Sequence, residues 1–279
     1  MSTNWILELI QAALSVWSEK LSEIYTLLTV TPENFRGGSI WSVISGIHDG
    51  LHALAYALLV LFFLTGVMRS ASSLTEIKRP EHALRLFLRF VIAKAAVTYS
   101  MDLLTAIYKI LQGVVTQISG SSGGLTAQPL TVPDELAQKV LEVGFLDSIP
   151  LTLVTVLCVA VIYVLSFLMI LTVYSRFFTL YMYTALAPVP LSSFAAEGSS
   201  GIGKQFLKSF AGVCLQGAVI LLACVIFSAF AASPPELPSG DASAALMVWQ
   251  YLGELIFNLL VLVGTVRLAD RIVRDMVGF

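Results

Sequence analysis

Long uninterrupted apolar runs constrain the fold of this chain more than any other feature of its sequence. A helix that crosses a hydrocarbon core of about 30 Å needs roughly 20 apolar residues. The runs 47–68, 149–174, 206–232 and 246–266 have that length. Composition agrees, because 57% of the 279 residues are hydrophobic and only 12% are charged. The chain is therefore predicted to be an all-α polytopic membrane protein.

A fifth run, 83–118, is apolar overall but carries charges within membrane length. A charge held in lipid costs on the order of several kcal/mol, so such residues are expected to face a partner helix, another subunit or a water-filled path. The alternative is that the two lysines reach opposite interfaces while the aspartate bonds to an internal donor. At 100° per residue, six polar side chains fall within about an 80° arc of one helix; this polar stripe is Lys94, Thr98, Asp102, Thr105, Lys109 and Gln112.

A sixth apolar stretch is interrupted by Pro188 and Pro190, which follow Ala187 closely. Each proline removes a backbone donor and disfavours helix in the residue before it. Backbone broken in this way is tolerated at membrane depth only where protein or water covers it. Residues 177–196 are therefore predicted to form a re-entrant or interfacial elbow rather than a span, leaving five spans in all.

The positive-inside rule gives the orientation, because short cytoplasmic loops hold an excess of Lys and Arg. If residues 177–194 spanned, Lys204, Lys208 and the arginines of the tail would fall outside. With the elbow on the cytoplasmic side, the amino terminus lies outside and the carboxyl terminus lies inside. Eleven of the 16 basic residues are then cytoplasmic: Arg69, Lys78, Arg79, Arg85, Arg89, Arg176, Lys204, Lys208, Arg267, Arg271 and Arg274.

Two amphipathic segments lie outside the spans. Residues 4–30 place apolar side chains at helical spacing, which predicts an extracytoplasmic amphipathic helix in a segment 1–36 that precedes a membrane domain, 37–279. This helix is expected to lie at the membrane interface or to pack on a neighbouring subunit. Residues 134–146 predict a second, shorter amphipathic helix. The amino terminus lacks the features of a signal peptide and is expected to be retained.

The stretch EGSSGIGKQF, residues 197–206, has the Gly and Gly-Lys order of a phosphate-binding loop through Gly203 and Lys204. A working loop needs a Ser or Thr after the lysine and joins a buried strand to a helix. Gln205 occupies the hydroxyl position, and the two prolines exclude a central strand upstream. No nucleotide and no other cofactor is therefore expected.

Metal binding and catalysis are not favoured by the sequence either. His48 and His52 lie four residues apart beside Asp49, which is half of a metal site, but no other His or Cys has useful spacing. The third histidine, His82, lies in a basic loop, so no nucleophile–base pair is evident and the chain is not expected to be an enzyme. The three cysteines lie inside apolar runs and are predicted to be buried small hydrophobes.

The basic loop RSASSLTEIKRPEHALRLFLR, residues 69–89, has two readings. Its arginines and lysines orient the chain and attract anionic lipid. Alternatively, they dock an acidic partner or the phosphates of a nucleic acid.

Residues 176–222 resemble the TrbL-type conjugal transfer proteins, which are polytopic platform subunits of bacterial type IV secretion systems. The likeness is closest to versions on mobile elements of Gram-positive bacteria. It consists of an Ala-Leu-Ala-Pro-Val-Pro turn, a small-residue loop with Gly and Lys, and a span that opens with Leu-Lys-Ser and contains Gln-Gly. The matching positions are Ala185, Leu186, Ala187, Pro188, Val189, Pro190, Gly203, Lys204, Leu207, Lys208, Ser209, Gln216 and Gly217.

The resemblance implies a homo-oligomeric platform in the bacterial cell membrane through which DNA with its attached relaxase leaves a donor cell. Implied partners are other secretion subunits, cytoplasmic ATPases, the lipid bilayer and transiently the DNA–relaxase substrate. The family's layout of five spans with an outside amino terminus agrees with the orientation derived from charge. The alternative function is a self-contained transporter or channel that uses the polar stripe, although no inverted repeat is evident.

Overall fold

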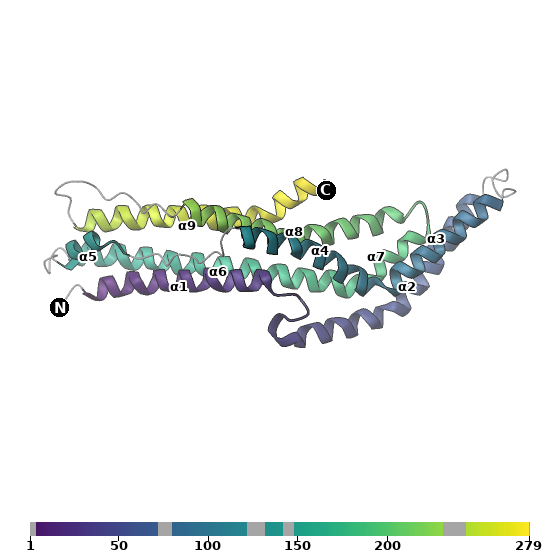
Figure 1. Ribbon diagram of the computed structural model, residues 1–279, viewed down its shortest axis with the longest axis horizontal. Helices are drawn as coiled ribbons and strands as arrows, with labels where there is room; N and C mark the ends of the chain where they lie inside the picture. The colour runs from purple at the N-terminus through teal and green to yellow at the C-terminus, as the bar shows by residue number, and fades with distance from the viewer. Residues whose placement is uncertain (1–3, 72–79, 122–131, 142–147, 231–243, 279) are drawn as a thin grey trace. The chain divides into compact units, whose positions relative to one another are not determined.

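The computed structural model describes residues 4–71, 80–121, 132–141, 148–230 and 244–278. Within these ranges the regular elements are all helical, as Figure 1 shows, and none is a strand. The chain forms two compact units, each assembled from separate stretches. Unit 1 comprises Met1–Thr29, Val115–Tyr174 and Gly217–Arg271, and unit 2 comprises Val30–Val114, Ser175–Gln216 and Ile272–Phe279.

Four of the described helices are long and apolar enough to cross a membrane, and a bent pair of helices makes a fifth candidate. This confirms the prediction of an all-α polytopic membrane protein. At 1.5 Å per residue, the longest helix, with 39 residues, extends about 58 Å, well beyond a hydrocarbon core. The four single helices are α2 (Ser39–Ala71), α6 (Ser148–Leu186), α8 (Ser200–Phe230) and α9 (Ala244–Val277).

The run 83–118 is not one straight helix. It forms α3 (Pro80–Thr98) and α4 (Ser100–Ser121), which are bent by 73° about Tyr99. Hydroxyl side chains explain the bend: Thr98 Oγ1 donates to Lys94 O and Ser100 Oγ donates to Val97 O, each at 2.8 Å. Such bonds compete for carbonyls of the helical ladder and bend helices.

The proline-broken segment is shorter than the sequence predicted. Residues 177–186 continue α6 without interruption, and the break begins at Ala187. Two short turns follow, α7 (Pro188–Leu191) and η2 (Ser192–Ala195). Nothing upstream of Pro188 interrupts helical hydrogen bonding, and proline itself is tolerated in the first turn of a helix. The elbow is therefore residues 187–196.

Unit 1 contains the predicted amino-terminal helix as α1 (Asn4–Thr29) and part of the second amphipathic segment as α5 (Asp134–Leu141). The two helices contact each other, and the Tyr174 hydroxyl of α6 donates to Glu23 Oε1 at 3.4 Å. The apolar face of α1 is thus covered by its own chain. Its buried side chains are Ile6, Leu7, Ile10, Ala13, Leu14, Trp17, Leu21, Ile24 and Leu28.

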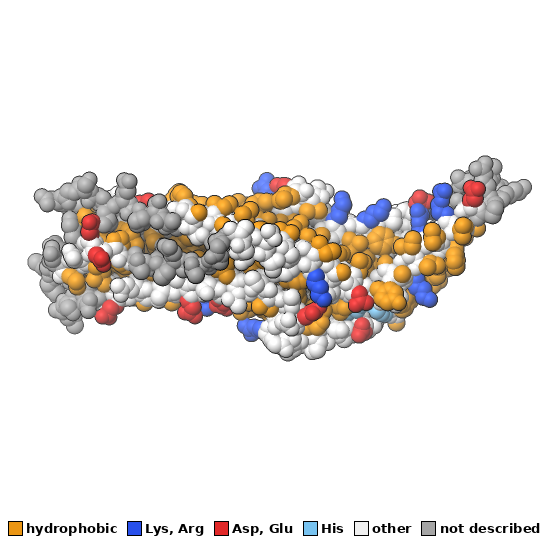
Figure 2. Space-filling model, in the orientation of Figure 1, with side chains coloured by type: hydrophobic (Ala, Val, Ile, Leu, Met, Phe, Trp, Pro, Cys, Tyr) orange, Lys and Arg blue, Asp and Glu red, His pale blue; other side chains and the backbone are white. Residues whose placement is uncertain are grey.

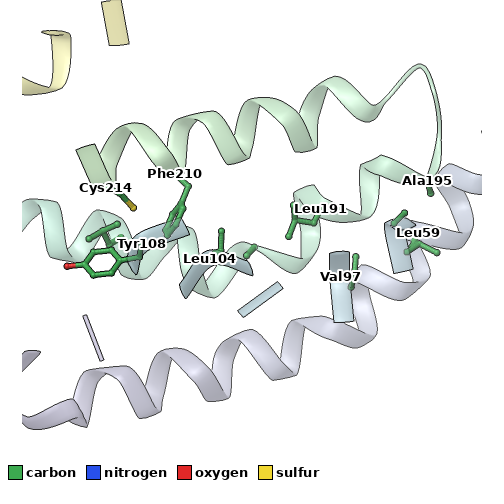
Figure 3. Close-up of a cluster of buried hydrophobic side chains, with 12 residues drawn as sticks. Leu59, Val97, Leu104, Tyr108, Leu191, Ala195, Phe210 and Cys214 are labelled. Carbon is green, nitrogen blue, oxygen red and sulfur yellow. The ribbon is translucent and has the colours of Figure 1, made fainter. Parts of the chain in front are cut away.

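The core of unit 2 forms where α2, α3, α4, α6, the elbow and α8 meet (Figure 3). Twelve buried side chains make up this cluster, and Phe35 of η1 (Phe35–Gly38) stacks on Phe177 of α6 with ring centroids 4.2 Å apart. The cluster is Ala55, Leu59, Ala93, Val97, Leu104, Tyr108, Leu180, Ala187, Leu191, Ala195, Phe210 and Cys214.

Candidate functional site

The elbow lies against α2 and α3. Figure 3 shows Leu191 and Ala195 of this segment beside the core residues Leu59 and Val97. Two serine hydroxyls stabilise its turns locally, since Ser192 Oγ donates to Val189 O at 2.6 Å and Ser193 Oγ donates to Pro190 O at 2.7 Å. The irregular backbone around the two prolines is therefore covered by protein, which is the condition for such a break at membrane depth.

The connector, residues 197–203, is held to the elbow by Ser193. The Gly203 N–H donates to Ser193 Oγ at 2.9 Å, and the Ser199 hydroxyl donates to Ser193 O at 2.9 Å. A Cβ at position 203 would lie 2.9 Å from the ring of Phe194, so only glycine fits here without movement. The amide that a phosphate-binding loop would offer to a nucleotide is thus already bonded. The Gly-Lys order serves packing, and Lys204 is exposed.

Two arginines that the sequence assigned to membrane orientation contact the connector. Arg89 of α3 pairs with Glu197, with closest N–O distances of 3.3 and 3.4 Å. The guanidinium of Arg69, at the end of α2, lies against Gly198, so a side chain at position 198 would require Arg69 to move. An exposed ion pair contributes only about 0–1 kcal/mol, so these contacts position the connector more than they stabilise it.

The remaining basic anchors are exposed where they are described. Arg85, Lys204, Arg267, Arg271 and Arg274 present their side chains at the surface, while Lys78 and Arg79 lie outside the described residues. Figure 2 shows Lys and Arg side chains among the apolar ones in the region of α3. Exposed apolar side chains such as Leu54, Val60, Leu61 and Leu64 on α2 suit contact with lipid.

Arg176 is a buried charge that joins two helices. Assigned from the sequence to a cytoplasmic segment, it lies inside α6, and only 1% of it is exposed. Its Nε donates to Val213 O and its Nη2 to Cys214 O, both at 3.2 Å, which ties α6 to α8. The Tyr108 phenol of α4 is close enough to interact with the guanidinium electrostatically.

No carboxylate pairs with Arg176 within the described ranges, and its Nη1 has no hydrogen-bond partner there. A buried charge without a partner carboxylate is costly, which makes Arg176 a functional candidate. One signal in the sequence pointed to it, because Arg176 is the only Lys or Arg between Ser148 and Leu186. The predicted span ended at residue 174, so the sequence analysis counted Arg176 only as a cytoplasmic charge.

The bend divides the polar stripe between two helices. Lys94 and Thr98 belong to α3, where Thr98 Oγ1 lies 2.9 Å from the Tyr56 hydroxyl. Asp102 is exposed in the first turn of α4, where a carboxylate is stabilised by the helix dipole. The six residues therefore do not share one face of a continuous helix as predicted.

Two stripe residues, Thr105 and Lys109, line a cavity in unit 2 with a volume of about 20 Å³. That volume is room for about one water molecule. The other lining residues come from the segment before α2 and from α2, α4, α6 and α8: Thr31, Pro32, Glu33, Trp41, Leu104, Tyr108, Leu180, Thr184 and Phe210. Gln112 lies further along α4, half-buried.

The chain was compared with protein-family models, curated proteins and solved structures. A family model described as "TrbL/VirB6 plasmid conjugal transfer like protein" matches residues 17–188, which extend from α1 to the first proline of the elbow. No curated protein and no solved structure matches the chain.

Proposed function

The chain belongs to the TrbL/VirB6 plasmid conjugal transfer family, and we propose that it is a membrane platform subunit of a conjugative type IV secretion system. In this role several copies help to move a DNA–protein substrate out of a donor cell. The observation that carries the proposal is the family match over residues 17–188 of a multi-pass membrane chain. The covered elbow supports it, since it gives this part of the chain a rigid, protein-braced junction suited to a scaffold.

The proposed orientation rests on charge, and the proposed partners rest on the family. We propose that the amino terminus lies outside, the carboxyl terminus lies in the cytoplasm, and the elbow and connector lie at the cytoplasmic side. Exposed Arg85 of α3 and Lys204 just after the connector then offer positive charge to cytoplasmic partners such as the ATPases that energise transfer. The DNA–relaxase substrate would make only transient contacts.

A self-contained transporter is the weaker candidate. It would need the polar stripe to line a path for solute, but the bend divides the stripe, and the cavity beside Thr105 and Lys109 has a volume of about 20 Å³. That cavity holds about one water molecule. The cavity that these two stripe residues line is therefore too small for a solute.

Deletion and complementation in the native donor cell test the proposal. Loss of the gene is expected to abolish conjugation, and the wild-type chain is expected to restore it. A tagged chain purified in mild detergent is expected to co-purify in multiple copies with other transfer proteins, including ATPases, as measured by mass spectrometry and native mass. Normal conjugation without the gene, or recovery only as a lone monomer or dimer that carries a solute flux, would favour the transporter.

A further inference from the structure

Three side chains on the amino-terminal half of α2 converge beside the α3–α4 bend. These are His48, Asp49 and His52, and their candidate ligand atoms all lie within 4.8 Å of one another. The His48 side chain is 1% exposed, whereas Asp49 is 71% exposed. Two histidines four residues apart do not by themselves complete a metal site. The structure adds the orientation of His48 and the environment of His52.

Ser100 is the hydrogen-bond partner of the buried Nε2 of His48. Ser100 Oγ donates its only proton to Val97 O at 2.8 Å. Toward His48 Nε2, which is also 2.8 Å away, the hydroxyl can then only accept. With the Ser100 proton on Val97 O, His48 carries its proton on Nε2, and its Nδ1 presents a lone pair.

That lone pair faces a carboxylate. His48 Nδ1 lies 3.3 Å from Asp49 Oδ1, and both atoms are acceptors in the neutral tautomer. A metal ion between the two atoms removes this conflict while the Ser100–Val97 hydrogen bond is kept. A Ser100 hydroxyl turned toward Nε2, with the imidazole proton on Nδ1 facing Asp49, would remove it without a metal ion.

His52 favours the metal ion. Its Nε2 is buried and has no hydrogen-bond partner within the described part of the chain. Its ring lies edge-on to that of His48, with centroids 4.7 Å apart. Two imidazoles and a carboxylate are a donor set that suits Zn²⁺. The His48–Ser100 bond is the outer contact that metal-binding histidines usually make through their second nitrogen.

We propose that His48, Asp49 and His52 bind a divalent transition metal ion of the zinc type. Three protein ligands leave a coordination position for water or for a group from a partner. Because Ser100 begins α4 directly after the bend, the bound ion braces α2 against the junction of α3 and α4. This site is independent of the role in conjugation.

Metal titration of the full chain tests the site. The protein is purified in mild detergent with a tag that contains no histidine, stripped with chelator, and titrated with Zn²⁺ by calorimetry and with Co²⁺ by visible absorption. The wild type is expected to bind one equivalent and to gain thermal stability from it. His52→Gln and Asp49→Asn should each weaken binding at least about tenfold, and Ser100→Ala by about 10- to 100-fold.

His82→Gln is the matched control, since it removes the remaining histidine of the chain, and it should bind as tightly as the wild type. Loss of the His48–Ser100 contact in His48→Gln would also loosen α4. The test of metal binding therefore rests on the conservative variants at positions 49 and 52. Each is checked for an unchanged elution volume. Wild-type binding no stronger than that of the His48→Gln/His52→Gln double variant would overturn the proposal. An equal loss in His82→Gln would overturn it too, because the metal would then lie elsewhere.

Discussion

At the scale of the residue, the absence of a Cβ at Gly203 allows the start of α8 to pack closely against the elbow. A Cβ there would lie 2.9 Å from the Phe194 ring, whereas a Cβ at Gly201 meets nothing within 4 Å. Gly203→Ala is therefore expected to destabilise the chain by about 1–3 kcal/mol through overpacking. Gly201→Ala should be neutral or slightly stabilising because alanine favours the helix. Thermal unfolding in detergent, followed by circular dichroism, measures both; equal melting temperatures would contradict the close packing of Phe194.

Substitutions of the buried Arg176 can distinguish a role in stability from a role in function. Replacing a buried ion with an apolar side chain of similar length is often neutral or stabilising by about 1–4 kcal/mol. Arg176→Met is therefore expected to keep or raise the melting temperature while it lowers conjugation frequency, because the costly charge is retained for function. Arg176→Lys keeps the charge but loses the two-pronged contact with the carbonyls of Val213 and Cys214. Full conjugation with Arg176→Met would assign this arginine a structural role only.

At the scale of the element, α1 tests whether its apolar face belongs to the fold. Trp17 is 2% exposed and Trp5 is 44% exposed on the same helix. Trp17→Ala is expected to cost about 3–5 kcal/mol, since a large buried side chain is removed. Trp5→Ala, the matched control, should change the melting temperature little. If the two variants behaved alike, α1 would lie free at an interface rather than pack in unit 1.

At the scale of the whole molecule, we expect the polar stripe to take part in assembly with partner helices or subunits. Lys94 and Asp102 are exposed on α3 and α4, where a partner helix or subunit would satisfy them. Lys94→Gln with Asp102→Asn is therefore expected to reduce conjugation frequency and recovery of the oligomer together. Asp134→Asn with Glu135→Gln, which neutralises two exposed charges on α5, is the control and should leave both unchanged. Reduced conjugation with an intact complex would place the stripe on the substrate's route instead.

The sequence by itself determined the fold class, the membrane runs and the amphipathic nature of α1. These depend on hydrophobic length and period, which are local properties of the chain. The buried cysteines were predicted for the same reason, and Cys158, Cys214 and Cys224 are all free and buried.

Only the tertiary structure decided where α6 ends, where the stripe bends and what covers α1. It also placed Arg176 between helices and turned the His48 ring toward Ser100. These features depend on contacts between segments far apart in the chain, such as the 52 residues that separate His48 from Ser100. The hydrophobic periodicity of a sequence indicates which side chains are buried, but not which residues they contact. Those contacts are determined by packing and by the hydrogen bonding of buried polar groups.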